Sequence, residues 1–378
     1  MTAVDQDTPG VRRAWGWVGH LRQGGTTPWR DWSVEGPSRG RLLPGAQQLE
    51  LLRRVNLAGT PSGTLVERIV TASAPGRGRP DLELDGAVEQ LRFGPAPVDP
   101  AGLPGHELVR VATGLLAEDL VASGTPERRR PPRPRPWRTR YCLVGDPVLT
   151  EPVRTGLTAR GRPPGEGGVV LVLATDLGRM LTDVWTTRCF EQGVPDWQDW
   201  LPTHVRHGTV PPRVDLVSVA RTWAGRVGPA RVHLVLDPTL VPRLVGVRRS
   251  LPAPLEVSAD GAELARRVGS VLGLLVAPPR RRALLQETLR PRVIALGGSP
   301  LVVPPEHDGW LHAQAVRMRD ALLRAGYAVH GDPDALLTAG WVGAPAPADD
   351  GVLGLALRLL LDHDRTGPTG PVFGKEGM

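Results

Sequence analysis

A run of seven residues without a polar side chain, Gly168–Ala174 (GVVLVLA), constrains the fold of this chain more than any other stretch. A strand with one solvent-facing side alternates apolar and polar residues, whereas a strand buried in a parallel sheet needs no such alternation. Further apolar segments at 140–144, 230–236 and 327–330 alternate with segments whose apolar residues recur at helical spacing. This order predicts an α/β fold with a mostly parallel sheet and helices on both faces.

The chain is expected to divide at residues 124–139, which are rich in Pro and Arg and cannot hold a helix. The remaining segments are predicted from apolar periodicity and from turn residues. They are a first strand and a glycine-rich turn over 1–34, a largely helical insertion over 35–123, an α/β core over 140–340, and a C-terminal helix with a disordered tail over 341–378.

Basic residues are almost all arginine. The 46 basic side chains comprise 45 Arg and one Lys, Lys375, near the C-terminus. This excludes from residues 1–374 a phosphate-loop lysine, a Schiff-base lysine and a lysine general base. The net charge of +7 has two interpretations. The protein binds an anionic partner, or its composition is biased so that Arg takes the place of Lys on the surface. Apolar residues make up 40% of the chain, enough for a buried core.

The densest basic run is 128–140, in which seven of 13 residues are Arg. An extended Arg-rich linker can bind an anionic polymer, and it can equally keep two domains apart by self-repulsion. Trp137 is the one aromatic residue within the run, too few for a single-strand stacking platform. Nucleic acid is therefore not the expected partner.

The two cysteines, Cys142 and Cys189, show no metal-ligand or disulfide-framework spacing. No apolar stretch reaches the roughly 20 residues that a transmembrane helix needs. The first 13 residues contain no apolar core of a signal peptide. These features predict a reduced, cytoplasmic protein with no membrane span and no bound metal.

A candidate anion site lies near the N-terminus. Residues 14–21 (AWGWVGHL) are predicted to form a strand that runs into Gly24 and Gly25, and Thr26-Thr27-Pro28 then resembles a helix start. A glycine turn between a strand and a helix directs backbone N–H groups at one point, where the helix dipole favours a phosphate. His20 is a candidate general base beside it. The alternative is a plain helix cap and a strand-end histidine.

Three segments resemble the actinobacterial sulfotransferase-like family. LRQGGTTPW (Leu21–Trp29) is similar to its LPKTGTT phosphate loop, and VVLVLATDLGRMLTDVW (Val169–Trp185) is similar to its strand–ARDL–helix segment. Residues 301–337, beginning LVVPPEHDGW, resemble its closing helix, strand and loop. With the residues between them, the second and third segments cover roughly 140–340.

The resemblance implies a three-layer P-loop-like fold that uses 3′-phosphoadenosine 5′-phosphosulfate (PAPS) as sulfuryl donor. Two cationic ligands of that family are missing here: Gln23 stands at the phosphate-loop lysine, and Thr175 stands at the arginine expected to bind the 3′-phosphate. Arg179 is a candidate replacement, one helical turn later. The implied donor-binding residues are Gln23, Gly24, Gly25, Thr26, Thr27, Thr175 and Arg179.

Three hypotheses follow. The first is transfer of a sulfuryl group from PAPS to a hydroxyl acceptor. The second is a non-catalytic relative that uses the same fold to bind a protein partner, which the two missing cations favour. The third is an anionic-polymer binder that acts through the Arg- and Pro-rich linker.

Overall fold

The computed structural model describes residues 8–37, 43–72, 81–87, 95–126, 141–165, 168–247, 251–337 and 340–366. The Arg-rich run at 128–140 and the tail at 367–378, expected to be disordered, lie outside the described residues. The chain forms two compact units. Unit 1 comprises residues 1–124, 270–277 and 348–378, and unit 2 comprises residues 125–269 and 278–347.

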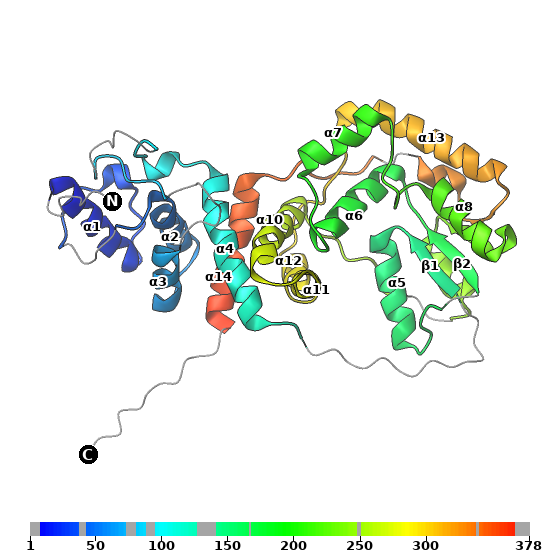
Figure 1. Ribbon diagram of the computed structural model, residues 1–378, viewed down its shortest axis with the longest axis horizontal. Coiled ribbons are helices and arrows are strands. Elements are labelled where there is room, and N and C mark those ends of the chain that lie inside the picture. Colours follow the sequence, from blue (N-terminus) through cyan, green and yellow to red (C-terminus); the bar gives the residue numbers. More distant parts are fainter. Residues whose placement is uncertain are drawn as a thin grey trace, which may run out of the picture. The chain divides into compact units, whose positions relative to one another are not determined.

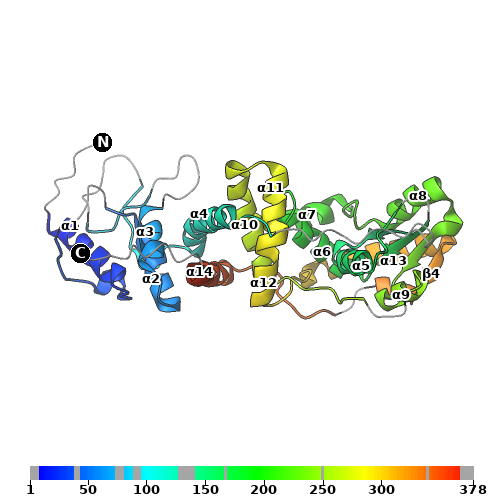
Figure 2. The ribbon, with the colours of Figure 1, turned by 90° about the horizontal axis from the view of Figure 1, so that it is seen from below.

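Unit 1 is helical over its described residues. Its helices include α1 (Pro9–Arg22), α2 (Ala46–Ala58), α3 (Gly63–Thr71), α4 (Gly105–Ser123) and α14 (Asp349–Thr366). Helices α4 and α14 lie alongside each other, as both ribbon views show, and bury leucines such as Leu116 and Leu359 (Figures 1 and 2). The prediction of a mainly helical segment at 35–123 agrees with α2, α3 and α4.

The strand predicted at 14–21 is wrong, because these residues lie inside α1. The Thr8 side chain accepts a hydrogen bond from the Val11 N–H, and Pro9 occupies the first helical turn. Both are strong helix-start signals. The buried side chains of α1 recur at helical spacing, at Val11, Trp15, Val18 and Leu21 among others. The tryptophans and glycines of AWGWVGHL resemble the alternating residues of a strand. These residues are helical because Thr8 and Pro9 start a helix before them, and the helix continues through them.

Unit 2 contains the four-stranded sheet. Strands β1 (Tyr141–Gly145), β2 (Val169–Leu173), β3 (Val232–Val235) and β4 (Ala328–His330) are all parallel and lie in the order β1-β2-β3-β4. The four strands predicted within 140–340, and their parallel pairing, are confirmed. In β2, four of the five residues are fully buried, as the apolar run predicted.

Helices alternate with these strands (Figure 1). A hydrophobic core joins α5 to one set of strand residues, including Leu143 of β1, Leu171 of β2 and Val235 of β3. Helix α8 contacts the first three strands. The helices of unit 2 are α5 (Pro147–Ala159), α6 (Leu177–Cys189), α7 (Trp197–His207), α8 (Leu216–Val227), α9 (Val241–Leu244), α10 (Ala259–Leu275, of which 259–269 belong to this unit), α11 (Pro278–Ala283), α12 (Arg290–Leu296) and α13 (Asp308–Arg324).

Among the described helices, none is long and apolar enough to cross a membrane.

Candidate functional site

Every strand of unit 2 is followed by an aspartate that caps the next helical segment. These are Asp146 after β1, Asp176 after β2, Asp237 after β3 and Asp332 after β4. Parallel strands end at one edge of a sheet, so that edge carries a row of carboxyl groups. It is also the edge at which open α/β sheets bind their ligands.

Gly145 sets the position of Asp146. Its φ of 101° lies in the left-handed region, and a Cβ built on it would lie 2.1 Å from the Leu173 carbonyl oxygen. Only glycine fits this approach of β1 to β2. The turn lets the Asp146 N–H donate to the Leu173 carbonyl at 2.8 Å.

The Asp146 carboxyl group is almost fully enclosed, with 1% of the residue exposed. Its Oδ1 accepts hydrogen bonds from the Val148 and Leu149 N–H groups at 2.8 and 3.1 Å. Its Oδ2 has no hydrogen-bond partner among the described residues. Burial raises the pKa of Asp146 to about 6, and these two hydrogen bonds oppose the shift.

Asp176 joins two distant segments. Its Oδ1 accepts from the Arg179 N–H at 2.9 Å, and its Oδ2 accepts from the Trp341 Nε1–H at 2.7 Å. Burial raises the pKa of this carboxyl group, and the two hydrogen bonds oppose the shift. The segment that follows Trp341 is held in place because the Val302 N–H donates to Ala344 O at 2.9 Å.

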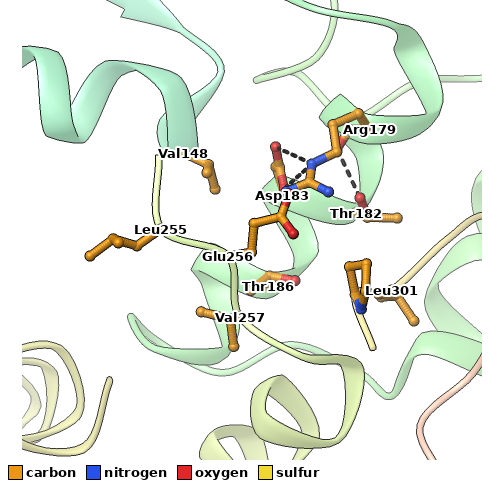
Figure 3. Close-up of a pocket in the computed structure, with 10 residues that line it drawn as sticks. Val148, Arg179, Thr182, Asp183, Thr186, Leu255, Glu256, Val257 and Leu301 are labelled. Carbon is orange, nitrogen blue, oxygen red and sulfur yellow. Dashed lines mark hydrogen bonds and ion pairs between the residues drawn. The ribbon is translucent and has the colours of Figure 1, made fainter. Parts of the chain in front are cut away.

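The Arg179 guanidinium is neutralised by carboxylates within unit 2 (Figure 3). Its Nε lies 3.1 Å from Oδ1 of Asp183, and one terminal nitrogen lies 3.1 Å from Oε1 of Glu256. The same guanidinium lies 5.4 Å from the centre of the Trp341 ring. Burial and the nearby Asp146 raise the pKa of Asp183 well above its usual value. Arg179 is thus a structural ion-pair partner in this arrangement.

A cavity of about 430 Å³ opens beside Asp176 and Arg179. Its apolar wall includes Leu301, Val303 and Leu311, and Trp341 lies at its edge with half of its surface exposed. This volume falls in the range of small-molecule sites. The carboxyl edge of the sheet therefore carries a cavity with charged, aromatic and apolar walls.

The glycine turn near the N-terminus has a different structure from the one expected. The Gly24 N–H donates to Leu21 O at 3.0 Å, and the Gly25 N–H donates to His20 O at 2.9 Å. Gly24 has a φ of 86° and ends α1 in the manner of a helix C-cap. The two amides expected to bind a phosphate are therefore used inside the protein. The nearest helix end is a carboxyl end, whose dipole repels anions.

The rest of this turn is also held by internal contacts. The Asn56 Nδ2 donates to both Leu21 O and Gly25 O at 2.8 Å, and the Trp17 indole N–H donates to Thr27 O at 2.9 Å. The Nε2 atom of His20 lies 3.1 Å from the Oγ1 atom of Thr27. His20 therefore does lie beside this turn, as its predicted role as a general base requires. The expected helix start at Thr26–Pro28 is replaced by a short 3-10 turn, Trp29–Asp31.

The predicted general base and the predicted donor-binding residues fall into two groups. His20 and Gln23 to Thr27 belong to unit 1, whereas Thr175 and Arg179 belong to unit 2. Within unit 2, Thr175 lies two residues after the end of β2 and directly before Asp176, and Arg179 lies in the first turn of α6, so both members of the second group lie at the carboxyl edge of the sheet. Their assignment as phosphate ligands stays a prediction.

Substitution of Gly24 tests the C-cap assignment. We expect Gly24→Ala to lower the free energy of unfolding of unit 1 by about 1–2 kcal/mol, because alanine is strained at this positive φ. Gly19 lies inside α1 with nothing within 4 Å of a built Cβ, so Gly19→Ala should raise it by up to about 1 kcal/mol. Amide hydrogen exchange of residues 9–22 measures both. Shifts of the same sign in the two variants would contradict the assignment.

Sequence reasoning missed Asp146, Asp183, Glu256 and Trp341. The first had a usable signal, because an aspartate follows each of the four strands predicted within 140–340. Glu256 and Trp341 had none, since each meets α6 only through the tertiary fold. Among the described residues, no group of three or more His, Cys, Asp or Glu side chains could hold a metal ion.

None of the protein-family models, curated proteins or solved structures with which the chain was compared matches it.

Proposed function

We propose that this chain is a ligand-binding protein, a non-catalytic relative of the sulfotransferase-like proteins, and that its ligand occupies the cavity at the carboxyl edge of the sheet. The observation that carries the proposal is the hydrogen bond from Trp341 to Asp176. It fixes an exposed aromatic ring over a small-molecule-sized cavity. A fixed ring binds a ligand at a lower entropic cost than a mobile one.

The charge at this cavity fits PAPS poorly. The donor carries phosphate groups and a sulfate, which require cationic ligands. Among the described residues that line the cavity, Arg179 is the one basic side chain, and Asp183 and Glu256 already pair with it. Asp176 and Asp308 add two more carboxyl groups. Sulfuryl transfer from PAPS is therefore not the function that this site supports best.

The site is tested with protein whose tryptophan indole nitrogens are labelled with ¹⁵N. The Trp341 indole resonance is assigned by its loss in Trp341→Phe. We expect this resonance to move when small aromatic ions or alcohols are added to the full chain. If ammonium, alcohol and carboxylate probes all leave it unmoved at millimolar concentration, the cavity is not a ligand site and the proposal fails.

Sulfuryl transfer from PAPS to a hydroxyl acceptor is the second candidate. The observation that favours it is the place of Arg179 in the first turn of α6, one helical turn after Thr175, the position at which the family resemblance expects an anion ligand. Calorimetry with adenosine 3′,5′-bisphosphate, the product of such a transfer, distinguishes the two functions.

For a non-catalytic protein we expect no binding heat, that is, a Kd weaker than about 1 mM. The double variant Asp183→Asn, Glu256→Gln releases Arg179 from its partners and serves as a control for a masked anion site. A micromolar Kd in the natural chain that Arg179→Ala abolishes would reverse the assignment in favour of transfer.

The proposal includes three further properties of the protein. They are a three-layer P-loop-like fold, a cytoplasmic location and a protein partner. A protein partner predicts co-purification of a second chain.

Binding of an anionic polymer through residues 128–140 is a separate prediction. Deletion of that segment should then abolish retention on heparin, and unchanged retention would contradict it.

A further inference from the structure

We propose that the cavity beside Trp341 binds an organic cation, an ammonium or guanidinium group carried on a small apolar body. The inference rests on the proposed function, because it names the ligand class for the same site. Its basis is the combination of carboxylates, an oriented indole ring and apolar walls around one cavity.

The charge balance around the cavity is negative in a chain whose net charge is +7. Asp176 and Asp308 line it, and Arg179 is the one basic side chain among its described lining residues. The carboxyl groups of Asp183 and Glu256 already contact that guanidinium from the neighbouring side. An anion entering the cavity would meet this excess of carboxylates, whereas a cation would be attracted.

Trp341 adds a second, independent preference for a cation. Its indole N–H is held by Asp176, so the orientation of the ring is set, and half of the residue is exposed. The ring already has one guanidinium near it, that of Arg179 at 5.4 Å from the ring centre. The face of an indole attracts ammonium and guanidinium groups more strongly than other aromatic side chains do.

The remaining walls select an apolar body for the ligand. Leu301, Val303 and Leu311 line the cavity, and Val342 next to Trp341 is 90% exposed. An exposed valine beside an exposed tryptophan leaves apolar surface that a ligand would cover. The volume of about 430 Å³ accommodates a small molecule.

The experiment compares three probes of similar shape on the full chain. These are 2-phenylethylammonium, the neutral 2-phenylethanol and the anionic 3-phenylpropionate. Calorimetry gives the affinities, and the ¹⁵N-indole resonance of Trp341 reports the location. We expect a Kd of about 0.1–1 mM for the ammonium ion and an affinity about tenfold weaker for the alcohol.

Matched variants show which side chains contribute to binding of the ammonium ion. We expect Trp341→Leu to abolish measurable binding, whereas Trp223→Leu should leave it unchanged, since Trp223 also lies near an arginine but does not line this cavity. Asp308→Asn should weaken binding about threefold. Glu306→Gln, at an exposed position two residues earlier that does not line the cavity, should not. Because Asp308 is exposed, we expect Asp308→Asn to stay folded, and it tests the inference if Trp341→Leu proves unstable.

The outcomes separate this inference from the proposed function. If the alcohol or the carboxylate binds as tightly as the ammonium ion and moves the Trp341 resonance, the cavity is a ligand site and the cation preference is overturned. If none of the three probes binds, both are overturned. Preferential binding of the ammonium ion that is insensitive to Trp341→Leu and Asp308→Asn would also overturn the inference, because the cation would then bind elsewhere.

Discussion

Gly145→Ala should destabilise the sheet of unit 2 by about 3–5 kcal/mol, the largest effect expected of a single methyl group in the described residues. The added Cβ would lie 2.1 Å from the Leu173 carbonyl oxygen, and neither β1 nor β2 can move away without loss of their pairing. The φ of 101° adds backbone strain for any residue with a Cβ. Amide hydrogen exchange of residues 141–145 and 169–173 measures the loss of protection directly.

Gly193→Ala is the matched control for this prediction. Gly193 has a similar φ, 87°, but no atom lies within 4 Å of a Cβ built on it. We expect Gly193→Ala to cost about 1–2 kcal/mol, the backbone contribution alone. Equal costs in the two variants would show that the close approach of β1 to β2 is not what requires glycine at 145, and that Asp146 is positioned by other contacts.

Acidification should stabilise unit 2 through Asp146. Folding raises the pKa of this carboxyl group from 3.8 to about 6, so the folded state binds more protons than the unfolded state between these values. The folded state is therefore favoured as the pH falls. At about 1.4 kcal/mol per pKa unit, the free energy of unfolding should rise by about 1.4 kcal/mol between pH 7.5 and 5, towards a limit of about 3 kcal/mol below the unfolded pKa.

Asp146→Asn removes this contribution, because asparagine can still cap α5 but does not ionise. It also removes the charge through which Asp146 raises the pKa of Asp183, so the variant should show a pH dependence smaller by at least about 1.4 kcal/mol over the same range. The comparison with the natural chain cancels the opposing titration of His204 and His233, whose pKa values are lowered by burial. An unchanged slope in Asp146→Asn would show that this carboxyl group is not the one that titrates.

Secondary structure was predictable where the signal lies within one segment. The apolar run of β2 and the Asp146 and Asp176 caps are local features, and the structure has all three. The strand expected at 14–21 is wrong because Trp15 and Trp17, with Gly16 between them, resemble the alternating residues of a strand. The decisive cap at Thr8 lies outside the segment. A helix begins where its first N–H groups find acceptors, and such a signal precedes the apolar pattern.

The candidate site could be predicted only in part. Arg179 was singled out correctly as a residue at the start of the helix after β2, yet its role as a phosphate ligand assumed a free guanidinium. Glu256 cancels that charge from a segment 77 residues away. Asp176 and Trp341 are 165 residues apart in the chain. No periodicity or motif spacing contains information about such pairs.

The amino-acid sequence alone determined that this chain would form a buried parallel sheet with an aspartate after each strand, and that no lysine in residues 1–374 could take part in chemistry. These properties depend on residue type and on neighbours a few positions away. The tertiary structure decided which charges remain available. It used the Gly24 and Gly25 amides to end a helix, paired Arg179 with carboxylates, and set Trp341 beside a cavity. Charge and hydrogen bonding act over a few ångströms in space, and only the folded chain brings these groups within that range.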